Sequence, residues 1–529
     1  MRLGLALSGG GFRAASFHLG VLKRMDELGL LSRVSVLSTV SGGAIVGALY
    51  ALRCSKEGNG SPGSFPVSDL IAEIRPHLTS NLRGVALFGR PERALRTIAS
   101  FVVPGVHRMP LVVDRLNTVF YAGSRVSQLP SWILISATNL RTGKSWKFFN
   151  DRAGDYLAGA TEHTDDILVA EAVGASAAYP VLVDPYPFHT RWEDLRADLL
   201  DENRWQRPAS RAGGHLSRWR SRYGKPEGEV TFPLVDGGLY DNEGLNGLRG
   251  AAITHAIISN ASPAEGDLIQ GNAVRVLART IDVMHARLGS STRQLAHEMT
   301  HGFHPNTART DLRKIAIELR AIADQSPSTA EELTKVAAQL DLLSAVGWPP
   351  RGHQFTETSQ ILLNSSAIAR NESARYEDPF DIPYQDRGLD EPLVEEVSRV
   401  RTDLDALEPD VFDLLVAQGY FLADAYLRTG VPSVIRECSG GTNPTCRQLR
   451  PSWDWAYKVI ADANAHSLST TSLLRKARRS NKLWGRCERT SLRLRLVTSA
   501  LLAGACFLVP AMLLCFLLFA LINWLLHVS

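Results

Sequence analysis

Glycines at positions 9, 10 and 11 separate a short apolar run from an amphipathic segment near the start of the chain. The apolar run, residues 3–7, predicts a buried strand, and residues 12–28 carry apolar side chains at helical spacing. Gly9, Gly10 and Gly11 therefore predict a strand-to-helix turn. The backbone N–H groups of such a turn lie at the positive end of a helix dipole, where they can bind an anion or a developing oxyanion.

Two other interpretations of this glycine run are disfavoured by the residues around it. A secretion signal would need a longer apolar segment followed by a cleavage site. Gly9, Gly11 and Ala14 match the loose dinucleotide pattern G-x-G-x-x-G/A, but the next predicted strand carries no acidic residue for a ribose. The Lys-Ser/Thr pair of a P-loop is absent as well.

A serine stands where that strand ends. Ser41 follows the predicted strand at residues 34–37, and Gly42 and Gly43 lead into a second predicted helix at residues 44–53. This layout is typical of a nucleophile elbow, a sharp strand-to-helix turn that exposes a serine hydroxyl. Thr39 stands where G-x-S-x-G has its first glycine. An ordinary glycine-rich strand end is the alternative.

A carboxylate ends a later strand in the same way. The β-rich run at residues 231–235 is followed by Asp236, Gly237 and Gly238. Catalytic groups gather at the C-terminal ends of strands in open α/β sheets, which makes Asp236 a candidate partner for Ser41. Taken alone, the stretch also reads as a common Asp-Gly turn.

In this order, "GGGFR", "STVSGG" and "VDGG" resemble the motifs of the patatin-like phospholipases, a family of serine acyl hydrolases. "ISATNLRTGKSWKFF" and "AVGASAAYPVLVDPY" are similar to two further stretches of that family. The resemblance covers about residues 1–300 and implies a three-layer α/β/α hydrolase fold.

The resemblance also implies roles for single residues. Ser41 would be the nucleophile and Asp236 its base, in a Ser–Asp dyad without histidine. The oxyanion hole would be formed by the backbone of the glycine run with Arg13 beside it. Gly43, Gly237 and Gly238 would support the two turns. Ala14 and Thr39 depart from the family pattern beside the reacting atoms. The resemblance implies no cofactor and no metal.

A Ser–His–Asp triad is the competing hydrolase mechanism, because His255, His285 and His301 follow Asp236 in the chain. His18, on the first predicted helix, is expected to pack or cap there. No Cys-x-x-Cys pair or acidic calcium loop is present. The scattered cysteines suit a reducing compartment, and a net charge of +4 over 529 residues gives no indication of a nucleic-acid partner.

The C-terminal part of the chain predicts a membrane anchor. Residues 466–495 are strongly basic, and residues 496–527 form an uncharged run longer than the roughly 20 residues that a spanning helix needs. Pro510 leaves open one kinked span or a re-entrant pair of helices. The basic flank places the catalytic body in the cytoplasm and can attract anionic lipid headgroups.

The predicted organisation has four parts. A catalytic domain covers residues 1–300, with an insertion at about 187–228, and a mainly helical region covers residues 301–465. The basic juxtamembrane segment and the anchor follow. The expected function is hydrolysis of phospholipid or lysophospholipid acyl esters. Acyl transfer by the same residues, a non-catalytic lipid-binding protein of this fold, and a nucleotide-binding membrane protein are the alternatives.

Overall fold

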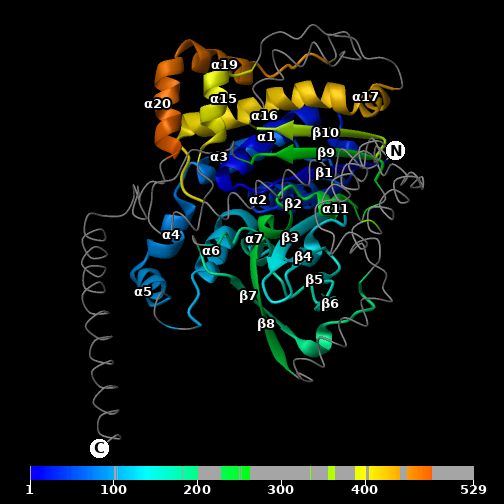
Figure 1. Ribbon diagram of the computed structural model, residues 1–529, viewed down its shortest axis with the longest axis vertical. Coiled ribbons are helices and arrows are strands. Elements are labelled where there is room, and N and C mark those ends of the chain that lie inside the picture. The colour runs from blue at the N-terminus through cyan, green and yellow to red at the C-terminus, as the bar shows by residue number, and fades with distance from the viewer. Residues whose placement is uncertain are drawn as a thin grey trace, which may run out of the picture.

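The computed structural model describes residues 2–100, 103, 105–180, 183–200, 228–249, 251, 253–262, 334, 355–363, 388–400, 404–440 and 449–478. A central sheet carries the fold (Figure 1). Its strands lie in the order β10 (Glu357–Leu362), β9 (His255–Asn260), β1 (Leu3–Leu7), β2 (Val34–Val40), β3 (Ile133–Asn139), β4 (Lys144–Phe148), β5 (Ala153–Asp155) and β6 (Gly159–Thr161). The strands from β10 to β3 are parallel, and the rest are antiparallel, so the sheet is mixed.

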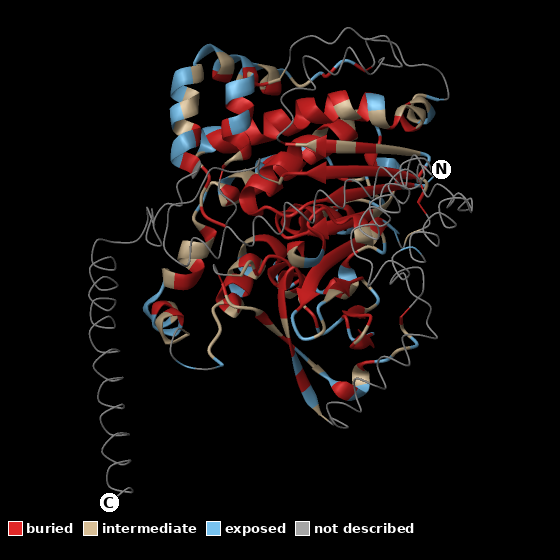
Figure 2. Cartoon of the chain, viewed as in Figure 1, coloured by how far each residue is buried: buried red, intermediate tan, exposed pale blue. Residues whose placement is uncertain are grey.

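Helices cover both faces of this sheet. Leu3, Leu5 and Leu7 of β1 point into the larger core, which they share with α1 (Gly11–Glu27) and α2 (Gly42–Lys56). Ala6 points to the other face, where it packs with Leu245 and Leu248 of α11 (Leu245–Arg249). This alternation along β1 is the two-residue period of a strand buried on both sides. The chain therefore has the expected α/β architecture, and Figure 2 shows the buried sheet between its helices.

Helices α3 (Val67–Leu78), α4 (Leu82–Phe88), α5 (Pro91–Ala99), α6 (Met109–Leu116) and α7 (Val169–Ser176) connect and flank these strands. Strand β7 (Tyr186–Arg191) pairs with β8 (Glu229–Asp236) along its whole length. The predicted insertion at 187–228 therefore begins too early: residues 187–191 are a strand of this hairpin, and Trp192 is buried against Phe232. Residues 201–227 lie outside the described part of the chain.

The sheet and its helical cover continue past the expected boundary at residue 300. Strand β10 lengthens the sheet next to β9, and helix α16 (Pro409–Gly430) packs along α1. The two helices approach closely at glycines: a Cβ on Gly20 would lie 1.9 Å from the Val416 carbonyl oxygen, and one on Gly419 would lie 2.2 Å from that of Phe17. Helices α15 (Glu391–Ser398), α17 (Pro432–Cys438), α19 (Asp454–Ala465) and α20 (Ser467–Arg478) surround α16 (Figure 1).

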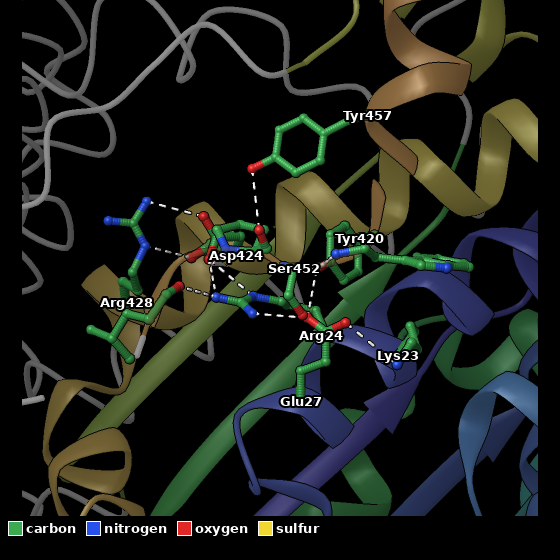
Figure 3. A network of polar contacts seen from close by, with 11 residues as sticks. Lys23, Arg24, Glu27, Tyr420, Asp424, Arg428, Ser452 and Tyr457 are labelled. Atoms are coloured by element: carbon green, nitrogen blue, oxygen red, sulfur yellow. Dashed lines mark hydrogen bonds and ion pairs between the residues drawn. The ribbon is translucent and has the colours of Figure 1, made fainter. Parts of the chain in front are cut away.

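A buried polar network joins α1 to α16 (Figure 3). Arg24 donates from Nε and Nη2 to Asp424 Oδ1 at 3.0 and 2.7 Å, and from Nη1 to Glu27 at 3.0 Å. Arg428 approaches the other oxygen of Asp424 at 3.2 Å, and Tyr420 donates its hydroxyl proton to Glu27. The described helices after residue 300 are thus part of the same folded body as the glycine turn.

No helix among the described residues is long and apolar enough to cross a membrane. The predicted anchor at residues 496–527 and the basic segment from residue 479 onward lie outside the described part of the chain.

Candidate active site

Strands β2 and β8 meet end to end on one edge of β3. Strand β4 pairs along one edge of β3, so β2 and β8 must both pair along the opposite edge. The last pair of β2 with β3 on this edge is Val40 opposite Ser136. At the next residue of β3, Ala137, the partner is Asp236 of β8. Because β2 is parallel and β8 antiparallel to β3, their C-terminal ends point at one another. Ser41, which directly follows β2, and Asp236, which ends β8, are therefore brought together.

Ser41 occupies a strained turn. Its backbone angles, φ 50° and ψ −115°, lie in a region that L-residues rarely adopt, between β2 and the first turn of α2. Its N–H donates to Ser176 Oγ at 2.8 Å, and that hydroxyl donates to the Ser136 carbonyl at 2.6 Å. Two neighbouring elements thus hold the backbone that presents the Ser41 hydroxyl.

The Asp236 carboxylate is fixed through both oxygens. Ser41 Oγ donates to Asp236 Oδ2 at 2.7 Å, and the Gly238 N–H donates to Oδ1 at 2.8 Å. The Asp236 N–H donates to the Ala178 carbonyl at 3.0 Å. Both side chains are buried, each about 4% exposed. A carboxylate held at this distance is positioned to accept the serine proton.

The glycine run lies beside Ser41. Gly10 and Gly11 have φ angles of 138° and 57°, which favour glycine at both positions. Gly9 is next to the serine, since a Cβ there would be 3.3 Å from Ser41 Cβ. Within the described residues, no backbone acceptor faces the Gly10 or Gly11 amide, and both precede or begin helix α1. These two amides are the donors that the turn offers to an oxyanion.

The expectation for Gly9 needs a correction. Its N–H donates to the Asn242 carbonyl at 2.9 Å, so this amide is already used within the protein. Gly9 instead permits a close approach, because a Cβ would lie 2.4 Å from Asn242 Oδ1.

Arg13 lies beside the glycine run, where a Cβ on Gly10 would be 3.1 Å from Arg13 Nη2. It is buried and donates from Nε to the Ala261 carbonyl at 3.1 Å and from Nη1 to the Val400 carbonyl at 2.7 Å. These bonds tie the start of α1 to the segment after β9 and to residue 400. Arg13 therefore holds the glycine turn in place.

The supporting glycines contact neighbouring backbone. A Cβ on Gly43 would lie 2.4 Å from the Leu7 carbonyl oxygen, one on Gly42 would lie 2.1 Å from that of Gly11, and one on Gly237 would lie 2.3 Å from that of Ser136. A Cβ on Gly238 would meet the Asn242 side chain at 2.7 Å. The serine turn, the glycine turn and the aspartate turn are in direct contact at positions that a larger residue would push apart.

His255, the triad candidate among the described residues, lies away from Ser41 and Asp236. His255 begins β9, opposite Leu3, whereas the glycine turn follows Leu7 at the other end of β1. Its ring bonds Thr254 and Ser433. This rules out His255 as the third member of a triad at Asp236. His285 and His301 lie outside the described residues.

His18 has a structural position, as expected. Its Nε2 lies 2.9 Å from the Ser8 carbonyl and its Nδ1 lies 2.8 Å from Ser259 Oγ. Complete burial lowers its pKa to about 4, the Ser8 hydrogen bond opposing this and Arg13 adding to it. The neutral ring therefore donates to Ser8 and accepts from Ser259, which links β1 to β9 directly before the glycine turn.

Sequence reasoning missed several residues of the site. Ser176 lies within the stretch "AVGASAAYPVLVDPY", whose similarity to the family could have indicated it. No sequence pattern indicated Asn242. Beneath the aspartate turn lie Lys147 of β4 and Asp241, both buried. Burial lowers the pKa of Lys147 to about 8, with Asp241 opposing the shift, and burial raises the pKa of Asp241. Backbone amides of Gly244 and Asn246 also bond Asp241.

Among the described residues, no group of three or more His, Cys, Asp and Glu side chains could hold a metal ion.

Comparisons with known proteins give one match in sequence and several in structure. Residues 5–249 match the family described as patatin-like phospholipase. No curated protein matches the chain. Human GIVD cytosolic phospholipase A2, in complex with methyl gamma-linolenyl fluorophosphonate and terbium chloride, is 11% identical with a TM-score of 0.37, over 83% of this chain and 60% of that one. VipD from Legionella pneumophila is 12% identical with a TM-score of 0.24, over 93% of each chain.

These structural scores are too low to carry an argument. The chain spans only 60% of the length of the human protein. The family match over residues 5–249 contains the glycine run, Ser41 and Asp236.

Proposed function

Residues 5–249 of this chain are a patatin-like phospholipase domain, and from that premise we propose that the protein is a lipid acyl hydrolase with Ser41 as nucleophile and Asp236 as base. The observation that supports this most is the 2.7 Å hydrogen bond from Ser41 Oγ to Asp236 Oδ2. It joins a strained serine to a buried carboxylate beside two backbone amides. The substrates proposed are phospholipids or lysophospholipids.

The mechanism follows from these positions. Ser41 Oγ attacks the ester carbonyl carbon while its proton passes to Asp236 Oδ2, and the Gly10 and Gly11 amides stabilise the resulting oxyanion. Asp236 returns the proton to the leaving alcohol as the C–O bond breaks, which leaves the acyl group on Ser41. Water then attacks with Asp236 again as base, releasing the fatty acid and restoring the serine.

We also propose that the C-terminal segment anchors the enzyme in its substrate membrane, with the catalytic body in the cytoplasm. The sequence supports this through the basic run and the uncharged run that follow residue 478. Tethering raises the local concentration of lipid at the site without any new contact there.

Hydrolysis of phospholipid and lysophospholipid in mixed micelles by the full-length protein tests the proposal. Ser41→Ala and Asp236→Asn should each lower kcat by roughly 1000-fold or more, because the two groups act as a unit. Ser55→Ala and Asp69→Asn, at exposed positions, are the matched controls and should retain wild-type rates. Wild-type rates in the Ser41 or Asp236 variants would refute the dyad.

A further inference from the structure

Helix α5 (Pro91–Ala99) is an amphipathic helix that buries only part of its apolar side. Ala94 and Thr97 are buried, and Thr97 donates its hydroxyl proton to the Leu87 carbonyl of α4 at 3.0 Å. Leu95, the residue after the buried Ala94, is 63% exposed. Figure 2 shows α5 at the margin of the molecule with much of its surface exposed.

The exposed apolar surface continues past the helix. The Val103 N–H donates to the Ala99 carbonyl at 2.8 Å, which keeps Val103 next to the last turn, and its side chain is 46% exposed. Pro91 is exposed as well. We call the surface formed by Arg90, Pro91, Leu95, Arg96 and Val103 the α5 patch.

Positive charge borders these apolar residues. Arg93 pairs with Asp114 at 2.5 Å, so its charge is offset within the protein. Arg90 and Arg96 are exposed, and among the described contacts neither has an ion pair. Glu92 is the one acidic residue of the helix. An exposed leucine flanked by unpaired arginines complements a surface that is apolar inside and negative outside.

Hydrogen bonds link the chain that follows the α5 patch to the segment that follows Ala178. Shortly after Val103, Arg108 donates from its backbone N–H and its side chain to Asp184, at 2.9 and 3.0 Å. Asp184 lies in the segment that leads away from Ala178, whose carbonyl accepts the Asp236 N–H.

The patch lies on the side of the molecule from which the C-terminal segment departs. In Figure 1, α5 and α20 are both on the left of the view, and α20 ends at Arg478, after which the chain continues for 51 residues to Ser529. The basic run and the uncharged run fall in those residues.

We propose that the α5 patch docks on the anionic membrane in which the C-terminal segment is anchored. Leu95 and Val103 enter the boundary between headgroups and acyl chains, while Arg90 and Arg96 contact lipid phosphates. This proposal rests on the proposed membrane-anchored function. It adds that the folded body has a fixed orientation on the bilayer, with α5 facing the lipid.

The first test uses the full-length protein in phosphatidylcholine vesicles with and without phosphatidylglycerol. Leu95→Glu combined with Arg96→Glu should lower hydrolysis of a bilayer phospholipid by at least about fivefold and abolish the stimulation by phosphatidylglycerol. It should leave hydrolysis of a soluble short-chain ester unchanged. The matched control is a second exposed Leu-Arg pair among the described residues, Leu140→Glu with Arg141→Glu, since Leu140 is 52% exposed on the β3–β4 turn. Equal vesicle rates in both double variants would overturn the proposal and favour a protein partner for the patch.

A second measurement is independent of catalysis. An environment-sensitive fluorescent amino acid at position 95 should be quenched by nitroxide-labelled lipids in the same vesicles, and one at position 140 should not. Absence of quenching at position 95 would overturn the docking proposal. Loss of soluble-ester hydrolysis in the Ser41→Ala variant tests the proposed function separately, so the two can fail independently.

Discussion

Ser41 depends on a hydrogen bond that belongs to neither the nucleophile nor the base. The Ser41 backbone N–H donates to Ser176 Oγ, and the Ser176 hydroxyl donates to the Ser136 carbonyl. All of these groups are buried, so water cannot replace a lost partner without a cavity. Ser176 is therefore a positioning residue for the proposed nucleophile.

The Ser176→Ala variant should leave the Ser41 N–H unsatisfied. A buried donor without a partner costs about 1–3 kcal/mol. If that cost relaxes the turn, kcat falls by roughly 10- to 100-fold while KM stays near the wild-type value. Steady-state kinetics on a soluble ester measure this split. Ser176→Thr, which keeps the hydroxyl, should restore most of the rate, and an unchanged kcat in Ser176→Ala would show that the contact has no positioning role.

Single residues differ in how far the sequence could predict them. Ser41 and Asp236 follow from residue type and motif, because a nucleophile elbow and an Asp-Gly-Gly turn have local signatures. The roles of Gly9 and Arg13 depend on Asn242, Ala261 and Val400. Those contacts span more than 200 residues of sequence, and no local pattern indicates them.

At the scale of elements, the direction of β8 decides the site. The strand was predicted, and so was a carboxylate at its C-terminal end, but an antiparallel β8 that abuts β2 along β3 was not. A strand's direction is set by its pairing partners, which are distant in sequence. For the same reason β7 was taken for part of an insertion, although it forms the hairpin with β8.

The junction of β1, α1 and β9 should make stability depend on pH through His18. Its pKa is lowered from 6.5 to about 4 in the folded protein, so the unfolded chain binds more protons between these values. The stabilisation is present above pH 6.5 and is lost as the pH falls toward 4, by up to about 3 kcal/mol.

Denaturant unfolding at pH 7 and pH 5 measures this loss. The wild type should be less stable at pH 5, and His18→Gln should show a smaller difference between the two pH values. His466→Gln, at an exposed position, is the control and should behave as the wild type. An equal pH dependence in His18→Gln would contradict the assignment to His18.

At the scale of the whole molecule, the helices after residue 300 belong to the catalytic body. Helix α16 packs along the helix that begins at the glycine turn, and Arg24 and Asp424 pair in its interface (Figure 3). The sequence predicted a helix in this region but placed it in a separate part of the chain. Hydrophobic spacing indicates that a helix has a buried face and does not indicate which surface covers it.

Asp424→Ala should therefore destabilise the entire fold. It leaves the Arg24 guanidinium buried without its main partner, which costs about 3–5 kcal/mol. Asp413→Ala on the same helix is the matched control. Asp413 pairs with the half-exposed Arg75 at 2.7 Å, and loss of such a surface pair costs about 0–1 kcal/mol. Free energies of unfolding from denaturant titration compare the two, and equal losses would argue against a shared body held by Arg24.

The most direct test of the account is covalent labelling of the solubilised full-length protein with a fluorophosphonate, followed by peptide mass mapping in the wild type and in Asp236→Asn. The account predicts one adduct, on Ser41, that is formed at a strongly reduced rate in the Asp236 variant. A folded wild-type protein that forms no adduct, or one on a different serine, would contradict the Ser41–Asp236 dyad.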